Sequence, residues 1–285
     1  MTSRWIAALV VVAFAAGCTP PDALPGDAAR EGAAAGGTLA RVREAGVVRA
    51  GIRFDFPPVS FVDAEGNWVG FDVELAEALA EKLGVRLEKE RVDETTRISF
   101  LETGRIDMAV ASMNHTRRRE EAIDFSQSYF WGHQTFLVRA GEAETIEDLF
   151  DRPVAMNKGS SAIDGWKAWA AAHGGEAGQI VEFGDKQEAI QALRTGAVDG
   201  YGEDDVPLLA LAGGEGELVL VPGGFNPVRY AIGVRENDSD WRDAVDQALQ
   251  EVWADGTFDE IYDRAFGPDS DTPLPLQPEG FEVWP

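Results

Sequence analysis

The chain has 285 residues, with 25 Lys and Arg against 50 Asp and Glu, and a formal charge of −25 at pH 7. Nucleic acids and anionic lipid surfaces attract clustered positive charge, so this balance argues against a nucleic-acid partner and against electrostatic adhesion to a membrane. A single cysteine excludes an internal disulfide, and the length suffices for two lobes with separate cores.

The first 17 residues are typical of a secretory signal. Arg4 precedes an apolar run over residues 6–16, which is too short to span a bilayer as a mature helix. The run ends in Ala-Ala-Gly followed by Cys18, a pattern that resembles a bacterial lipobox, in which the cysteine carries the lipid. Residues 18–38 are rich in Pro, Gly and Ala, so we expect them to form a flexible tether to the membrane.

Strand and helix patterns alternate along the body of the chain. Residues 47–54 and 85–92 read as strands, and residues 71–83 read as an amphipathic helix with apolar residues four apart, followed by Gly84. Such alternation predicts an α/β fold in which a mostly parallel sheet carries helices on both faces. Residues 268–285 contain many prolines and predict an extended C-terminal tail.

The segment 101–130 carries the strongest indication of function. It predicts a helix closed by Gly104, a buried strand over 106–111, and a polar Ser-x-Asn-x-Thr loop that opens a short basic helix. Hydroxyl and amide groups at the carboxyl end of a strand, followed closely by arginine, favour a site for a small carboxylate.

A weak internal repeat supports two similar units. Leu-x-Thr-Gly-x-(Ile/Val)-Asp occurs at 101–107 and again at 193–199, in each case as a helix end, a glycine cap and a strand start. One such copy is common, and two αβ turns of similar chemistry would also produce the pair. Two copies at matching points favour two lobes.

The segment 101–130 resembles the polar amino-acid-binding proteins of solute-binding family 3 of bacterial ABC importers, nearest their glutamate- and aspartate-binding subgroup. The residues that match the family pattern are Ser112, Asn114, Arg119, Phe125, Ser126 and Tyr129, and the resemblance extends over about 39–267.

This resemblance implies a periplasmic binding protein type II fold, with two lobes hinged around a ligand cleft. Lobe 1 would comprise 39–132 and 229–267, and lobe 2 would comprise 133–228, with crossings near 131–134 and 225–229. It also implies an exported monomer, facing the periplasm or the cell exterior, that binds a polar and possibly acidic amino acid and delivers it to ABC transporter permease subunits.

The resemblance further implies the residues that bind the ligand's α-amino and α-carboxylate groups. Arg119 would grip the α-carboxylate, with Ser112 and Asn114 as further donors, although threonine is usual in the family at position 114. Asp204 would bind the α-ammonium group, with Asp205 as the alternative one position away. The loop 158–161 resembles a Gly-Thr-Thr loop, so Ser160 and Ser161 could help to bind the carboxylate or could simply cap the next helix.

Specificity for the ligand side chain is the more open question. Arg53, Arg97 and Lys186 match cationic positions of the acidic-amino-acid binders, and Phe56 would form an apolar wall. Three cations would suit a second carboxylate. Glu94 opposes this interpretation, because it stands where that subgroup has a small hydroxyl residue.

The sequence is compatible with three functions: a binding component of an importer, an enzyme and a sensor module. The three histidines show no metal spacing and the chain offers no cysteine nucleophile for catalysis, so we expect no metal, no cofactor and no enzyme activity. Cyclohexadienyl (arogenate) dehydratases share the implied fold, and Glu203 or Glu94 could supply their general acid. An extracytoplasmic sensor module is the third alternative, disfavoured because the sequence has no second apolar segment.

Overall fold

The computed structural model describes residues 37–212 and 217–274. The predicted signal segment, Cys18 and nearly all of the predicted tether lie outside the described residues, as does the C-terminal part of the predicted tail. Among the residues that are described, no helix is long and apolar enough to cross a membrane.

The chain forms a mixed α/β structure around one nine-stranded sheet with the order β5-β1-β6-β12-β7-β10-β8-β9, in which β11 pairs with β7. A second, small sheet has the order β2-β3-β4. The elements are α1 (Gly37–Ala45), β1 (Val47–Arg53), β2 (Asp55–Phe56), β3 (Ser60–Val62), β4 (Trp68–Val69), α2 (Phe71–Lys82), β5 (Arg86–Val92), α3 (Arg97–Glu102), β6 (Met108–Ala109), η1 (Arg119–Glu121), β7 (Ile123–Arg139), η2 (Ile146–Leu149), β8 (Val154–Asn157), α4 (Ala162–Ala172), β9 (Ile180–Phe183), α5 (Lys186–Arg194), β10 (Gly200–Asp204), α6 (Asp205–Leu211), β11 (Leu218–Leu220), β12 (Asn226–Arg235), α7 (Ser239–Ala254) and α8 (Thr257–Phe266).

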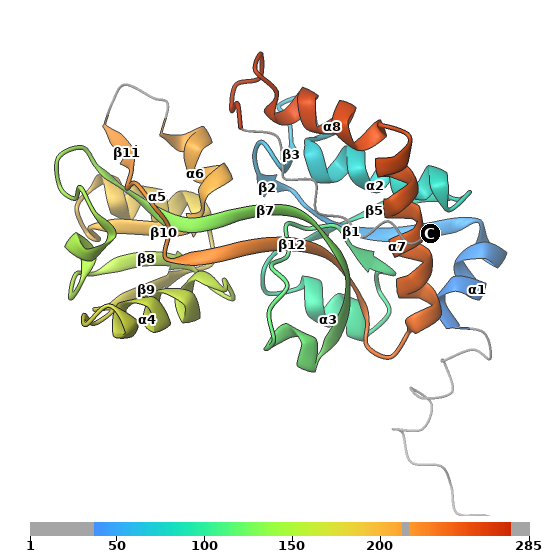
Figure 1. The fold of residues 1–285 in the computed structure, drawn as a ribbon, viewed down its shortest axis with the longest axis horizontal. Coiled ribbons are helices and arrows are strands. Elements are labelled where there is room, and N and C mark those ends of the chain that lie inside the picture. The colour runs from blue at the N-terminus through green and yellow to red at the C-terminus, as the bar shows by residue number, and fades with distance from the viewer. Residues whose placement is uncertain (1–36, 213–216, 275–285) are drawn as a thin grey trace, which may run out of the picture. The chain divides into compact units, whose positions relative to one another are not determined.

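Two parallel strand groups stand on either side of the long antiparallel pair β7 and β12. Strands β5, β1 and β6 run parallel to one another, and so do β10, β8 and β9. Figure 1 shows β7 and β12 passing from one group to the other. We call the β5-β1-β6 group with β2 to β4, α1 to α3, the segment 110–122 with η1, α7 and α8 the first lobe, and the β10-β8-β9 group with β11, η2 and α4 to α6 the second lobe.

The helix predicted over 71–83 is α2, and its sequence explains where it ends. Apolar residues at Phe71, Leu75 and Leu79 are fully buried, which is the face that a 3.6-residue period places on the core. After Leu83 the chain turns at Gly84, whose φ of 70° is the left-handed conformation that glycine adopts at least cost.

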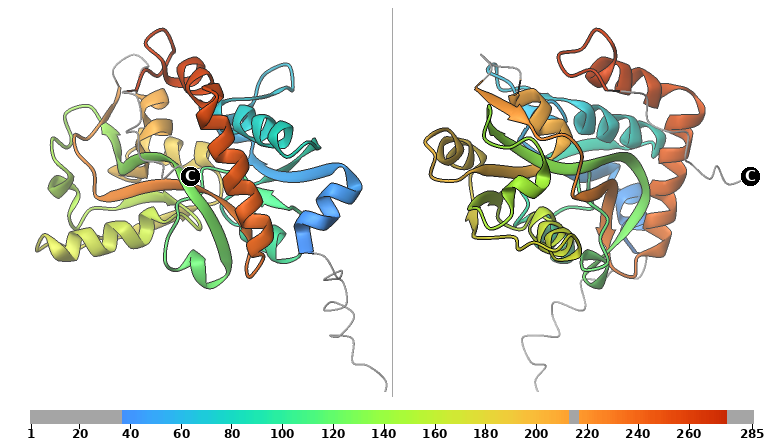
Figure 2. Two further views of the ribbon diagram at one scale, coloured as in Figure 1. Left: turned by 45° about the vertical axis from the view of Figure 1, so that its right-hand side comes forward. Right: turned by 60° about the vertical axis from the view of Figure 1, so that its left-hand side comes forward.

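The first lobe buries both faces of its strands. Met108 and Val110 pack in one cluster with α2, α7 and α8, and the alternating residues Ala109 and Ala111 pack in another beneath α3. Figure 2 shows α7 and α8 on the same side as α2, and these helices contact one another. The prediction of a strand over 106–111 is only partly right: the whole run is buried, but only Met108–Ala109 forms the strand β6.

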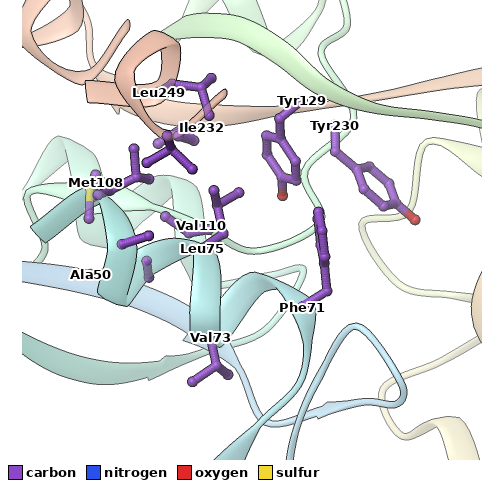
Figure 3. Close-up of a cluster of buried hydrophobic side chains, with 14 of the residues drawn as sticks. Ala50, Phe71, Val73, Leu75, Met108, Val110, Tyr129, Tyr230, Ile232 and Leu249 are labelled. Atoms are coloured by element: carbon purple, nitrogen blue, oxygen red, sulfur yellow. The ribbon is translucent and has the colours of Figure 1, made fainter. Parts of the chain in front are cut away.

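An aromatic cluster closes the core of the first lobe near β7 and β12. The ring of Phe71 lies 6.0 Å from that of Phe130 and 5.3 Å from that of Phe266, and Phe130 stacks on Tyr230 at 5.2 Å. In Figure 3, Phe71, Tyr129 and Tyr230 lie at the opposite end of the cluster from Met108. This packing anchors both long strands to the first lobe.

The second lobe repeats the same arrangement. Phe136 of β7 packs with Trp166 of α4 on one face, while the next residue, Leu137, packs with Tyr201 of β10 on the other. The strand predicted to start within the repeat at 193–199 begins just after it: β10 runs from Gly200 to Asp204, so Asp204 is its last residue.

Candidate ligand-binding site

The ten predicted ligand-binding residues lie at or just after the carboxyl ends of strands, or at the helix starts that follow. Arg53 ends β1, Asp204 ends β10, and Lys186 begins α5. Nine of the ten are buried and Ser161 is partly buried. Because parallel strands end at a common edge, the fold gathers residues from distant parts of the sequence there.

Arg119 and Asn114 of the first lobe meet the second lobe directly. The Arg119 guanidinium donates from Nη1 to the Asn114 carbonyl oxygen at 2.8 Å and from Nη2 to the Gly159 carbonyl oxygen at 3.3 Å. The Asn114 amide nitrogen donates to Ser161 Oγ at 2.9 Å and to Asp204 Oδ1 at 3.4 Å. The predicted short basic helix is a single 3₁₀ turn, η1, which begins at Arg119.

Asp204, rather than its neighbour, faces this group. Its carboxylate accepts hydrogen bonds from Gln134 Nε2 at 2.8 Å and from the Tyr230 hydroxyl at 2.7 Å. Burial raises the pKa of Asp204, although these two bonds oppose the rise. Asp205 lies against His133 instead, with Oδ2 3.0 Å from the ring Nδ1, and this bond raises the pKa of His133 despite partial burial.

Ser112 and Ser160 use their polar atoms within the protein. The backbone N–H and hydroxyl of Ser112 both donate to Asp72 Oδ2, at 2.7 and 2.8 Å, and Tyr129 donates to the other oxygen at 2.9 Å. These bonds hold Ser112 at a φ of 46°, an unusual conformation for serine. Ser160 Oγ accepts from the Ala162 N–H at 3.2 Å, although the N-cap residue of α4 is Ser161, whose side chain makes no capping bond.

A second group of charges surrounds Phe56. Arg53 donates to Asp55 at 3.1 Å and to Glu94 at 3.1 Å, and its guanidinium lies 4.0 Å from the centre of the Phe56 ring. The Lys186 ammonium lies at the same distance from that ring. Phe56 belongs to the first lobe and Lys186 to the second, so this cation–π contact also joins the lobes.

Burial and neighbouring charges shift the pKa values of these groups. Burial lowers the pKa of Arg53, but Glu94 and Asp55 outweigh this effect and raise it above its ordinary value. Burial, reinforced by Arg53, lowers the pKa of Lys186 to about 8. Burial, reinforced by Glu94 and Asp204, raises the pKa of Glu203 to about 8.

A cavity of about 280 Å³ opens beside the Phe56 group. It is lined by Arg53, Asp55, Asp93, Glu94, Thr95, Asn157, Lys158, Phe183, Gly184 and Lys186. Three buried polar atoms of predicted site residues have no hydrogen-bond partner: Lys186 Nζ, Arg97 Nε and Asn114 Oδ1. Buried polar atoms are normally paired, and of these three residues Lys186 lines the cavity, where a polar ligand would complete its hydrogen bonding.

Arg97 lies between the two groups. Its Nη1 donates to the Ala111 carbonyl oxygen at 2.6 Å, which ties it to the strand end before Ser112. Burial lowers its pKa, with Glu94 and Asp204 opposing and Arg53 adding to the shift. Over residues 37–212 and 217–274, no group of His, Cys, Asp and Glu could hold a metal ion.

The sequence reasoning did not include several residues that complete the site. Asp55 neutralises Arg53, Gln134 holds Asp204, and Asn157 donates to Glu203 Oε2 at 2.5 Å. Asp55 lies two residues beyond Arg53 on the same loop, a spacing that could have suggested the pair. No local pattern indicates that Gln134 would be fully buried beside Asp204.

A two-lobe sheet joined by two long strands, with charged residues at its strand ends, defines a two-lobe solute-binding fold. The chain belongs to the bacterial extracellular solute-binding proteins, family 3, whose model matches residues 48–268. The chain is 27% identical over 237 residues to the L-cystine-binding protein TcyJ of Escherichia coli K12, covering 82% of this chain and 87% of that protein.

Two solved structures are similar to the chain. An ancestral arginine-binding protein bound to arginine has a TM-score of 0.72 and 34% identity, over 78% of this chain and 99% of that one. The ancestral amino acid-binding protein AncCDT-1, described as a precursor of cyclohexadienyl dehydratase, has a TM-score of 0.70 and 29% identity, over 80% of this chain and 98% of that one. These similarities agree with the fold and family expected from segment 101–130.

Proposed function

We propose that this protein is the substrate-binding component of an ABC importer for a polar amino acid. One observation carries this proposal: Arg119 and Asp204, from opposite lobes, converge on the same residue, Asn114. A cation and a carboxylate a short distance apart complement the two charges of an amino-acid zwitterion. Two similar proteins are an L-cystine-binding protein and an arginine-binding protein, which supports an amino acid as the ligand here.

We infer that the ligand side chain is acidic. The carboxylates of Asp55 and Glu94 are already paired with Arg53, whereas the Lys186 ammonium beside the cavity is buried against the Phe56 ring and has no hydrogen-bond partner. A ligand carboxylate in the cavity would pair with Lys186. Glu94 limits this preference, since it takes up part of the positive charge that Arg53 would otherwise offer.

Ligand binding by the stripped protein tests both proposals. L-Cystine and each of the twenty amino acids are added to ligand-free protein, and thermal unfolding and binding calorimetry are measured. A ligand at about 100 times its Kd adds roughly 2.7 kcal/mol to the free energy of unfolding. If the protein binds none of these compounds, the importer proposal is wrong. If the protein prefers arginine, lysine or a neutral amino acid, only the inference that the ligand side chain is acidic is wrong.

The lobes are proposed to span 39–132 with 229–267, and 133–228, with hinges near 131–134 and 225–229. The pairing of β7 with β12 supports this division, because residues 226–229 lie opposite residues 131–134 in the sheet. Bending at that level would move the lobes without breaking either core.

Export and anchoring are part of the same proposal. Residues 1–17 would direct export, and lipid on Cys18 would anchor a monomer that delivers its ligand to a permease. Cys18→Ser should release the protein from the membrane fraction, because the proposed tether carries no other apolar anchor. A Cys18→Ser protein that remains processed and membrane-bound would contradict the lipid anchor.

A dehydratase activity is the alternative, and the similarity to AncCDT-1 supports testing it. The Glu203 carboxyl has the raised pKa of a general acid, but its oxygens accept from Asn157 and from the Asp204 N–H, and it does not line the cavity. Glu94, the other candidate acid, lines the cavity but is paired with Arg53 at 3.1 Å. Binding without turnover is therefore the better-supported function. Release of phenylpyruvate from prephenate would favour the enzyme.

A further inference from the structure

Asp204 is held by residues of the two long strands that connect the lobes. Gln134 lies on β7 and Tyr230 on β12, and each donates to a different oxygen of the Asp204 carboxylate, at 2.8 and 2.7 Å. Gln134 is fully buried and stands opposite Asp204 in the sheet. The carboxylate therefore has a fixed orientation that does not depend on its own strand alone.

Gln134 makes two further hydrogen bonds. Its Nε2 also donates to Ser161 Oγ at 3.0 Å, and its Oε1 accepts from Asn226 Nδ2 at 2.7 Å. Asn226 is the cross-strand neighbour of Gln134 on β12. This acceptor bond sets the orientation of the Gln134 amide, so both of its N–H groups are directed at Asp204 and Ser161.

The same hydrogen bonds leave the hydroxyl hydrogen of Ser161 free to donate. Its oxygen accepts N–H groups from Asn114 and from Gln134. A hydroxyl has two acceptor positions and one hydrogen, so the remaining hydrogen of Ser161 is the part left to donate. A ligand carboxylate is the natural acceptor for a hydrogen at this place.

We propose that Gln134, on a strand that joins the lobes, is a positioning residue for ligand binding. It orients the Asp204 carboxylate toward the ligand's α-amino group and the Ser161 hydroxyl toward the ligand's α-carboxylate. This inference rests on the proposed function. Gln134 lies with Asp204 in the proposed second lobe, where the two are paired across β7 and β10, whereas Tyr230 lies in the proposed first lobe; bending between the lobes would therefore move Tyr230, and not Gln134, relative to Asp204.

The proposal predicts a change in the pH dependence of binding. Donors bound to a carboxylate favour its ionised form, and the ligand ammonium needs that form. Removing Gln134 as a donor should raise the pKa of Asp204. As the pH is lowered, Asp204 would then be protonated earlier, and the affinity for the ligand would begin to fall at a higher pH than in the wild type. The other groups whose charges or bonds act at Asp204 are Glu94, Arg97, Asn114, Arg119, His133, Glu203, Asp205 and Tyr230.

The test is calorimetry with the whole protein and its Gln134→Met variant, each titrated with the twenty L-amino acids at pH 7. The amino acid that binds the wild type is then titrated between pH 4.5 and 8. Gln134→Met should weaken binding at least tenfold at pH 7 and move the acid limb of the affinity profile to higher pH. Gln187→Met, an exposed glutamine on α5, is the matched control and should leave both unchanged.

Two more variants keep the test decisive if Gln134→Met folds poorly. Tyr230→Phe deletes the donor to the second oxygen of Asp204 and should move the acid limb in the same direction. Asn226→Ala releases Gln134 without touching Asp204, and should give a smaller shift of the same sign. A lower melting temperature with an unmoved acid limb in these variants would mean that the network is only structural and would overturn the proposal. A wild type that binds no amino acid would instead refute the proposed function.

Discussion

Arg119 is the residue on which the proposed recognition of the ligand depends most. Arg119→Ala should weaken amino-acid binding by roughly 2–5 kcal/mol, because it leaves a buried ligand carboxylate without its partner. Arg117→Ala is the matched control, since that side chain is exposed. Arg118 is less suitable, because it pairs with Asp164 of α4 at 2.9 Å. Equal losses at Arg117 and Arg119, measured by calorimetry, would show that the wrong arginine has been assigned.

Glu94 should control how strongly an acidic side chain is preferred. Glu94→Gln removes one of the two carboxylates paired with Arg53, which frees positive charge beside the cavity. We expect the ratio of glutamate to glutamine affinity to rise at least tenfold, about 1.4 kcal/mol. Glu90→Gln, at an exposed ion pair with Arg105, is the control. An unchanged ratio in Glu94→Gln would mean that the side chain of the ligand does not reach Arg53.

Asp72 should contribute to stability in a pH-dependent way. Asp72→Ala leaves the Ser112 and Tyr129 donors buried without an acceptor, which should cost roughly 3 kcal/mol or more. Burial raises the pKa of Asp72 to about 6, so between about pH 4 and 6 the folded form holds a proton that the unfolded form has lost.

The contribution of Asp72 is therefore complete below about pH 4 and shrinks as the pH rises through 6. Denaturant unfolding of the wild type and of Asp72→Ala at pH 4 and pH 7 should give the larger difference in free energy at pH 4. A larger difference at pH 7 would contradict this account of Asp72.

Motif spacing in the sequence predicts which residues lie in the candidate site, but it does not predict which side chains they pair with. The pattern around Arg119 and the strand ends at Arg53 and Asp204 can be read from the sequence, because each is a local feature. The pairing of Arg53 with Asp55 and Glu94 depends on how β2 and the turn before α3 are oriented. Likewise, the bonds of Gln134 arise only when β10 and β12 flank β7.

The contact between α4 and β12 should be intolerant of added volume. A Cβ at Gly165 would lie 2.7 Å from Asn226 Cγ and 2.8 Å from its Cβ. In most helices Gly→Ala stabilises by about 1 kcal/mol, but here the clash should reverse the sign. Gly165→Ala should lower the melting temperature and weaken ligand binding, since Asn226 holds Gln134. Gly184→Ala, with no atom within 4 Å, serves as the thermal control; a stabilised Gly165→Ala protein would show that α4 can move away.

The alternation of strands and helices is readable because each element has its own period, whereas element ends are set by tertiary contacts. Helix α2 ends where Gly84 predicts, but β6 is short because it pairs with β12 at a single position, Gly233 with Ala109. Strand β10 extends to Asp204 because β7 pairs with it through Gln134. No local signal in either strand carries that information.

At the scale of the whole described chain, one continuous sheet runs through both lobes. Gly159 of the second lobe lies close to the first lobe: a Cβ there would lie 3.1 Å from the Glu94 carbonyl oxygen. Gly159 also has a φ of 82° and accepts a hydrogen bond from Arg119. A side chain at this position should obstruct the approach of the lobes.

Gly159→Ala and Gly141→Ala together separate this obstruction from backbone strain. Gly141 has the same φ of 82°, but a Cβ there would meet no atom within 4 Å. Both variants should lose similar stability, about 1 kcal/mol, because alanine is strained in the left-handed region. Only Gly159→Ala should also lose ligand affinity, by fivefold to tenfold, because only its methyl group stands between the lobes. Calorimetry beside thermal unfolding checks this, and equal affinities in the two variants would mean that ligand binding does not require the lobes to approach at Glu94.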